Sequence, residues 1–463
     1  MKTLIDPPEA LGDGLAAIRA EFQVPDSFPP AVLAAAEAAA RRAPTEHVDR
    51  TDRAFVTLDP ATSTDLDQAF AIEPAGADLL LHYAIADVGW FVRDGDPLDA
   101  EAWRRGETLY LPDSKAGLYP PALSEDAASL LPTGPRPAVV FTVRIAPDGG
   151  ATLDGVERAL IRSRAKLAYE GVADADLPAG FAELSTRVAA AEAARGAARV
   201  DPPQQEVEAV AGGGYTLAFQ PRLQSEDRNA ALSLATNLAV ADALAAHNTG
   251  LFRVMPAPDA RGETRLRHTA QALGLSWPAD QSLKAFERTL TGVDAREAAF
   301  MLALRRASPG TSYAAYRAGV VPWHSAVAAT YAHATAPLRR LADRYVIEAA
   351  LAIANGLPVP AATTEAFERL PPVMAHADAL AGRINRAVID LAEAAMLAPR
   401  VGERFAAAVI DADDHGARIQ LSDLAVAARL PDRDLRPGDR LSVELIAANP
   451  LRRTVSFRRA PAS

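Results

Sequence analysis

The sequence has no cysteine among its 463 residues. Disulfide bonds and thiolate metal sites are therefore excluded, so any metal or catalytic site must use other side chains. No apolar stretch reaches about 18 residues without a charge, and the first residues lack the apolar centre of a signal peptide. We therefore expect no membrane span and a cytoplasmic protein.

Basic residues are fewer than acidic ones: the chain has 48 Lys and Arg and 59 Asp and Glu, which gives a net charge of −11. Nucleic-acid affinity depends mainly on neutralising phosphates, so this balance argues against a polyanionic ligand. The charge is unevenly distributed, however, since residues 302–346 contain six arginines and one acid. This local excess is compatible with a basic RNA channel. The alternative is an arginine-rich helix face exposed to solvent.

Length and sequence pattern divide the chain into three parts, as expected for its size. Residues 1–50 show two helical patterns around a proline-rich break, and could form a small helix-turn-helix-like unit. Residues 51–398 begin with short β-like runs and become helical after residue 167, with a hairpin tip expected at residues 212–214. Residues 399–463 contain short strands at regular spacing, which favours a five-stranded OB-type barrel. The predicted fold class is α+β.

The most informative motif is an acidic loop between two apolar, strand-like runs at residues 55–58 and 69–72. It places Asp59, Asp65 and Asp67 within nine positions. Three carboxylates this close repel one another unless a cation or solvent compensates them. Oxygen ligands at this density suit Mg²⁺, which keeps waters and substrate phosphates in its shell. For an isolated D-x5-D-x-D pattern, the alternative is a solvated acidic turn.

Three sequence blocks together resemble the ribonuclease II (RNB) family of exoribonucleases. The acidic loop matches the family pattern D-x5-D-x-D-D except at the last acid, where this chain has Gln68. The second block lies within residues 83–130 and includes the Tyr-Leu-Pro segment at 110–112. The third, at residues 331–343, is similar to Y-x-H-x-[TS]-[SA]-P-[IL]-R-R-x2-D. Three blocks in the family's order make chance agreement improbable, so the chain is identified as a member of this family.

The resemblance implies an architecture. Residues 51–398 would form the RNB catalytic domain, a mixed β-sheet with helices, and the barrel at 399–463 is similar in position to the family's RNA-binding S1 domain. Most family members that resemble this chain carry a pair of cold-shock-type barrels before the catalytic domain. The 50 residues available here are too few for two such barrels. We therefore expect a short form without that pair.

The resemblance also implies an activity. It is Mg²⁺-dependent hydrolysis of single-stranded RNA, processively from the 3′ end, with release of nucleoside 5′-monophosphates. No protein partner or membrane is implied, and a monomer is expected. Two divalent ions about 4 Å apart can position the water and stabilise the attacking and leaving oxygens. Two rival functions remain open: a non-catalytic RNA-binding member disabled at Gln68, and a metal phosphodiesterase acting on DNA or small nucleotides.

The resemblance assigns the metal site to four residues. Asp59, Asp65, Asp67 and Gln68 would hold Mg²⁺, and Asp67 would be the carboxylate least dispensable to the chemical step. Gln68 can offer an oxygen to a metal but carries no charge. Either it is a tolerated ligand replacement, or the second ion is held mainly by substrate.

The third block supplies the expected phosphate contact. Arg339 matches the family arginine at the scissile phosphate, a role that suits a guanidinium because it binds phosphate oxygens bidentately and stays charged. Alternatively, Arg339 and Arg340 form a pair that neutralises Asp343. Pro337 suits the start of a helix, whose free N–H groups would also favour phosphate.

Four further residues are candidates for RNA binding. Tyr110 and Tyr169 match positions where the family places aromatic rings near the terminal bases, and such rings stack on any base. Each could instead be half-buried with a satisfied hydroxyl group. Arg340 and His333 could contact neighbouring phosphates, although His333 could equally be a packed, hydrogen-bonded residue.

Overall fold

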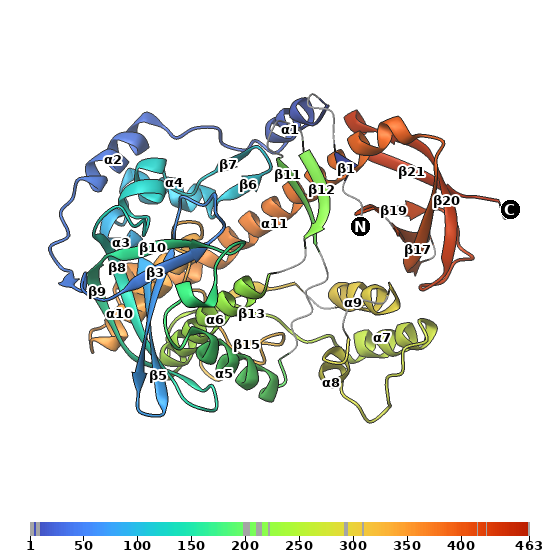
Figure 1. Ribbon diagram of the computed structural model, residues 1–463. Helices are drawn as coiled ribbons and strands as arrows, with labels where there is room; N and C mark the ends of the chain where they lie inside the picture. Colours follow the sequence, from blue (N-terminus) through green and yellow to red (C-terminus); the bar gives the residue numbers. More distant parts are fainter. Residues whose placement is uncertain are drawn as a thin grey trace.

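The computed structural model describes residues 4–5, 10–197, 204–209, 215–220, 223–290, 295–307, 310–413, 415–422 and 424–461. The hairpin tip expected at residues 212–214 lies outside the described residues. A mixed sheet with its helices forms one body, and a small β-barrel forms another (Figure 1). The long helix α11 (Ala361–Leu397) runs from the first body to the second, and contacts helices of the first and strands of the second.

A seven-stranded sheet organises the first body. Its strands, in spatial order, are β10 (Ser163–Ala168), β3 (Phe55–Asp59), β4 (Gln68–Ala75), β5 (Asp78–Ala86), β8 (Arg136–Ile145), β9 (Ala151–Ile161) and β2 (Val48–Asp49). The two outer pairs are parallel and the inner pairs antiparallel, so the sheet is mixed, as predicted. The central strand β5 is buried along most of its length, as its nearly continuous apolar sequence requires.

Helices cover the sheet. Helix α6 (Gln224–Ala246) packs against β8 and β9, together with α5 (Phe181–Ala194) and α10 (Leu341–Ala354). Among the described helices, α6 alone is long and apolar enough to cross a membrane, but most of its apolar window is buried inside this body. It is therefore best explained as a core helix. The short helices α3 (Val88–Phe91), α4 (Pro97–Arg105) and the π-helical turn η1 (Leu123–Ala127) surround α2 (Pro30–Ala40).

The two N-terminal helices belong to different cores. Helix α1 (Ala10–Glu21) packs on α11, and a Cβ atom built on Gly14 would lie 2.5 Å from a methyl carbon of Leu391. Helix α2 instead buries Val32 and Ala36 in the core of the sheet. The two helices thus anchor separate parts of the molecule and do not form the compact helix-turn-helix-like unit suggested by their sequence.

The C-terminal segment forms a barrel. Its strands β19 (Ala427–Leu430), β18 (Gly416–Leu421), β17 (Arg404–Asp413), β20 (Arg440–Asn449) and β21 (Thr454–Arg459) form one antiparallel sheet in this order. Strand β19 also contacts β21, so the sheet nearly closes on itself. At Gly416 the backbone has φ +131°, and a Cβ atom there would lie 2.4 Å from the Leu430 carbonyl oxygen. The predicted α+β class and OB-type barrel are confirmed.

Smaller elements complete the described fold. Helices α7 (Ala260–Ala272), α8 (Leu283–Glu287) and α9 (Ala295–Ala307) enclose a separate aromatic cluster that contains Phe286 and Phe300. The remaining pairs are β1 (Leu4–Ile5) with β12 (Tyr215–Gln220) and β11 (Gln204–Ala209), β6 (Leu109–Leu111) with β7 (Ser114–Ala116), β13 (Leu251–Val254) with β14 (Ser312–Ala315), and β15 (Trp323–His324) with β16 (Ala329–Thr330). Single 3-10 turns are η2 (Asp174–Asp176), η3 (Ala398–Arg400) and η4 (Pro450–Arg452).

Candidate active site

The acidic loop connects two neighbouring strands, since β3 ends at Asp59 and β4 begins at Gln68. The loop is fixed by Leu66, whose side chain is fully buried. Its backbone N–H donates to Ser129 Oγ at 2.9 Å, and its carbonyl accepts from the Leu130 N–H at 3.0 Å. The residues on either side of this anchor, Asp65 and Asp67, are therefore held in defined positions.

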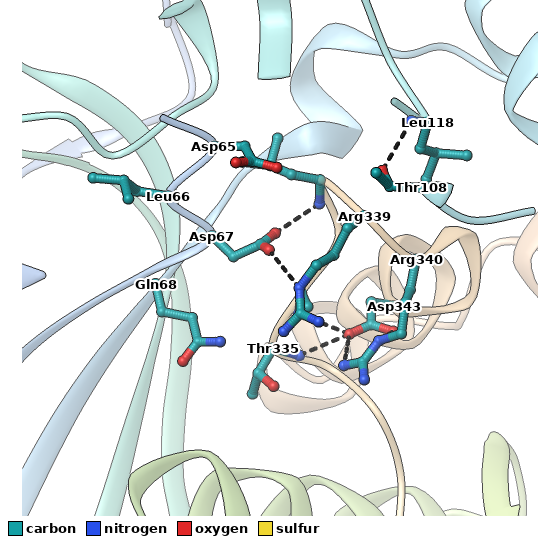
Figure 2. A network of polar contacts seen from close by, with 12 residues as sticks. Asp65, Leu66, Asp67, Gln68, Thr108, Leu118, Thr335, Arg339, Arg340 and Asp343 are labelled. Atoms are coloured by element: carbon teal, nitrogen blue, oxygen red, sulfur yellow. Dashed lines mark hydrogen bonds and ion pairs between the residues drawn. The ribbon is translucent and has the colours of Figure 1, made fainter. Parts of the chain in front are cut away.

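Asp67 meets the third sequence block. Its side chain accepts hydrogen bonds from the Leu338 backbone N–H at 2.7 Å and from Arg339 Nε at 3.3 Å (Figure 2). Asp67 is only 4% exposed. Burial raises the pKa of its carboxyl group to about 7, although Arg339 and the Leu338 N–H favour the charged form.

The turn that carries Arg339 is held by Asp343. This carboxylate accepts from the N–H groups of Thr335 and Ala336 at 3.0 and 2.8 Å, and from Arg340 Nε and Nη2 at 3.0 and 2.8 Å. After this turn Arg340 is extended and the Leu341 N–H donates to the Gly106 carbonyl oxygen at 2.9 Å, so helix α10 begins only at Leu341 and the helix start expected at Pro337 was wrong. Of the two arginines that could neutralise Asp343, Arg340 does so and Arg339 pairs with Asp67 instead. The Arg339 side chain stays 43% exposed.

Asp59 carries an uncompensated oxygen. Its Oδ2 atom is buried and has no hydrogen-bond partner. Burial, reinforced by the charge of Asp65, raises the pKa of Asp59 to about 6, against the opposing charges of Arg339 and Lys166. Asp59 thus keeps a buried oxygen that no protein donor satisfies, and in Asp67 the effect of burial outweighs that of Arg339 and the Leu338 N–H. This donor set fits a divalent cation, which supplies that charge to carboxylate oxygens.

Asp65 has a partner that the sequence did not reveal. Lys115 Nζ, on strand β7, lies 3.1 Å from Asp65 Oδ1 and 3.0 Å from Glu125 Oε1. Glu125 also accepts from Thr64 Oγ1 at 3.1 Å. The only available signal was the rarity of lysine, at four residues in the chain, and rarity does not say which acid a lysine meets.

Gln68 points away from the acids. Its Oε1 atom accepts from the Tyr83 hydroxyl and from Ser233 Oγ, the latter at 3.0 Å, and the two hydroxyl oxygens are 2.7 Å apart. Figure 2 shows its amide group directed away from Asp65 and Asp67. Throughout the described part of the chain, no three Asp, Glu, His or Cys residues are arranged to hold a metal ion. The expected four-residue ligand set is therefore not assembled in this structure.

The two candidate tyrosines differ. Tyr110, on β6, is 55% exposed as a whole, but desolvation of its hydroxyl group, together with the nearby charge of Asp65, raises the tyrosine pKa. Its ring is available for stacking. Tyr169 is half-buried, and its hydroxyl oxygen accepts from Asn229 Nδ2 at 2.8 Å. Burial raises the pKa of Tyr169 to about 12, so its geometry matches the structural alternative.

His333 and Arg340 are directed to protein partners. His333 Nδ1 lies 2.8 Å from the Tyr313 hydroxyl, and its ring packs edge-on against Tyr313 and Tyr331. Burial, together with the positive charge of Arg340, holds the pKa of His333 well below its usual value. His333 therefore matches the packed alternative. The structure brings the three loop aspartates, Tyr110 and Arg339 together, and engages the other predicted residues elsewhere.

Part of the arginine-rich segment is paired with acids. Arg317 pairs with Glu368, and Arg344 pairs with Asp99. Arg340 is engaged by Asp343, as described above. At the C-terminus, Arg453 and Arg458 pair with Glu21 and Glu444. The local excess of positive charge is therefore smaller than the sequence suggested, and Arg339 is the prominent exposed cation of the third block at the site.

Family models match most of the chain. The RNB domain matches residues 47–353, and the RNase II-type exonuclease C-terminal S1 domain matches residues 403–460. Ribonuclease R of Aquifex aeolicus (strain VF5) is 27% identical over 439 residues, covering 87% of this chain and 61% of its own. Exoribonuclease 2 of Cronobacter sakazakii is 28% identical over 408 residues, covering 83% and 62%. The chain thus spans about three fifths of the length of these relatives.

Solved structures share the fold. Mycoplasma genitalium RNase R in complex with ribose methylated single-stranded RNA has a TM-score of 0.86 at 18% identity, covering 98% of this chain and 78% of its own. Yeast Ssd1, a pseudonuclease, has a TM-score of 0.67 at 16% identity, covering 90% and 53%. The same fold therefore occurs both in an RNase R solved with bound RNA and in a pseudonuclease. The fold alone does not separate a catalytic from a non-catalytic protein, so the function has to be argued from the residues of the site.

Proposed function

This chain belongs to the RNB family, and on that premise we propose that it is a Mg²⁺-dependent exoribonuclease. It would hydrolyse single-stranded RNA processively from the 3′ end, release nucleoside 5′-monophosphates, and act in the cytoplasm as a monomer. The observation that carries the proposal is that Asp67 accepts hydrogen bonds from the Leu338 backbone N–H and from the Arg339 side chain. It places the acidic loop and the proposed phosphate-binding arginine at one point.

The metal would be held by Asp59 and Asp67, the two buried carboxyl groups whose pKa values are raised. Bound Mg²⁺ supplies charge stabilisation at phosphate oxygens and lowers the pKa of a bound water. The protein's contribution is to exclude solvent around Asp67 and to hold the loop through Leu66. Asp343 fixes the turn before α10. The turn that carries Arg339 therefore does not have to become ordered when RNA binds.

Substrate contacts follow from exposure and charge. The partly exposed guanidinium of Arg339 can bind phosphate oxygens while its Nε atom remains near Asp67. Tyr110 offers a ring on which a base can stack without sequence preference. The C-terminal barrel would guide single-stranded RNA towards this site, as OB-type folds do.

The test is incubation of purified protein with a 5′-labelled single-stranded RNA and Mg²⁺. We expect progressive shortening from the 3′ end, with nucleoside 5′-monophosphates identified by chromatography. A circular RNA of the same sequence should stay intact, and a DNA strand of that sequence should be cut far more slowly, because the 2′-hydroxyl distinguishes the two. Cleavage of the circle would indicate an endonuclease, and equal cleavage of DNA would favour a general phosphodiesterase.

A second candidate function is non-catalytic RNA binding. It is favoured by the neutral Gln68, whose amide is turned towards Tyr83 and Ser233, and the fold of yeast Ssd1 accommodates it. Under this alternative, labelled RNA would be retained in a binding assay but would remain intact at every Mg²⁺ concentration. That result would replace the exoribonuclease proposal.

A further inference from the structure

Lys115 is an internal cation of the candidate site. Its Nζ atom lies between two carboxylates, 3.1 Å from Asp65 Oδ1 and 3.0 Å from Glu125 Oε1, and its side chain is 28% exposed. A lysine ammonium that contacts two carboxylates is a positive charge at neutral pH.

The hairpin that carries Lys115 is fixed to the rest of the site. Strands β6 and β7 place Tyr110 opposite Lys115. Just before this hairpin, the Thr108 backbone N–H donates to the Arg339 carbonyl oxygen at 3.0 Å, and just after it the Leu118 N–H donates to Thr108 Oγ1 at 3.0 Å (Figure 2). The position of Lys115 is thus coupled to the turn that presents Arg339.

The acids of the site differ in how directly they meet a positive charge. Lys115 pairs with Asp65 and Glu125, and Arg339 pairs with Asp67. Within the described residues no cation forms an ion pair with Asp59. Lys166 acts on Asp59 only from a distance, because its Nζ atom is directed to the Ala61 carbonyl oxygen at 2.8 Å. A second divalent ion at Asp65 would have to displace an ammonium that already contacts both of the nearest acids.

We propose that Lys115 supplies the fixed positive charge at Asp65 in place of a second divalent ion, so that this chain holds one ion, at Asp59 and Asp67. The inference rests on the proposed function for the identity of the site, and it specifies the site's ion requirement. It also explains why position 68 holds a neutral glutamine. An acid at this position would add a negative charge that no second ion is present to balance. A lysine near a phosphate-binding arginine can in addition attract substrate phosphate as a point charge.

The experiment counts bound ions directly. Mn²⁺ replaces Mg²⁺ as the probe because both prefer carboxylate and water oxygens, and free Mn²⁺ is read by electron paramagnetic resonance. Wild-type protein should bind one Mn²⁺ per chain in the high-affinity range. Lys115→Met, which frees Asp65 and Glu125, should bind a second ion, whereas Lys115→Arg, which keeps the charge, should bind one.

A matched control is Lys284→Met. Lys284 has nearly the same exposure, 29%, and also pairs with an acid, Glu287 at 3.1 Å, but it lies on the separate helix α8. Its removal should leave the count at one. Two high-affinity ions in the wild type, or an unchanged count of one in folded Lys115→Met, would overturn the inference. If Lys115→Met does not fold, the wild-type count alone decides.

Failure of the inference and failure of the proposed function are distinguishable. The wild-type protein is assayed in parallel for degradation of single-stranded RNA. Intact RNA with the expected ion counts would contradict the exoribonuclease and support the role of Lys115. Degraded RNA with two tight ions in the wild type would support the exoribonuclease and overturn the role of Lys115.

Discussion

The Asp67 carboxylate accepts a 2.7 Å hydrogen bond from the backbone N–H of Leu338, 271 positions later in the chain. Apart from proline, which has no backbone N–H, any residue at position 338 can supply this donor. It fixes one carboxylate oxygen, and leaves the other near Arg339 Nε at 3.3 Å. The acidic loop and the arginine turn are therefore placed relative to each other by the backbone, before any ligand binds.

Asp67→Asn should abolish RNA cleavage by orders of magnitude and change RNA affinity by no more than a few-fold. The amide keeps the shape of the side chain and an oxygen for the Leu338 N–H, but it removes the charge that a metal ion and Arg339 require. Single-turnover rates and filter binding measure the two quantities. The control is Asp174→Asn, an exposed acid paired with Arg228. Cleavage at the wild-type rate by the Asp67→Asn variant would contradict the assignment.

Arg339→Ala should lower the cleavage rate far more than it weakens RNA binding. One phosphate contact among many contributes little to total affinity, whereas a contact to the reacting phosphate acts on the transition state. The side chain is partly exposed, so thermal stability should change little. Rates, affinities and melting temperatures are compared with those of wild type. An equal loss of rate and affinity would make Arg339 a general RNA contact.

Arg340→Ala should behave in the opposite way, and reduce stability. It leaves the buried Asp343 without its bidentate partner, and breaking a buried pair on one side costs about 3–5 kcal/mol. Urea unfolding monitored by circular dichroism measures the loss, with Arg339→Ala as the neighbouring control. A stable Arg340→Ala protein with reduced RNA affinity would instead support the phosphate contact expected from the sequence.

The sequence predicted residues better than it predicted their partners. Asp67 and Arg339 could be selected because they belong to ordered motifs, and the strands around the acidic loop could be predicted from apolar runs. The contacts of Lys115 and Ser233 could not, because they depend on how a distant hairpin and helix pack against the loop. Pro337 shows a second limit. Its sequence favours a helix start, but Arg340 is extended and the Leu341 N–H donates to the distant Gly106 carbonyl oxygen, so the helix begins only at Leu341.

Gln68→Ala should destabilise the protein without changing its Mg²⁺ requirement. Tyr83 is fully buried, and its hydroxyl would lose one of its two partners, at a cost of about 1–3 kcal/mol. Thermal unfolding and a Mg²⁺ titration of RNA degradation give the two values. Ser233→Ala is the matched control, since it removes another member of the same network from α6. A several-fold higher Mg²⁺ requirement in Gln68→Ala alone would identify Gln68 as a metal ligand.

Metal affinity should rise with pH across the range in which Asp59 and Asp67 lose their protons. The pKa values of these carboxyl groups are raised to about 6 and about 7, mainly by burial, so in the metal-free protein both groups hold protons well above the usual range for aspartate. A divalent ion binds the ionised forms and must release those protons. Apparent Mn²⁺ affinity should therefore increase from about pH 5 to about pH 7 and level off above about pH 8.

The same shifts determine how the stability of the metal-free protein depends on pH. A carboxyl group whose pKa is higher in the folded state favours folding when protonated, so this contribution is present at low pH and is lost as the pH rises from about 4 through about 7. Saturating Mn²⁺ should restore stability most strongly at the upper end of that range. Calorimetric unfolding with and without Mn²⁺ measures both effects, and Asp59→Asn should reduce the pH dependence of each. A Mn²⁺ affinity that is constant from about pH 5 to about pH 8 would show that these two carboxylates do not hold the ion.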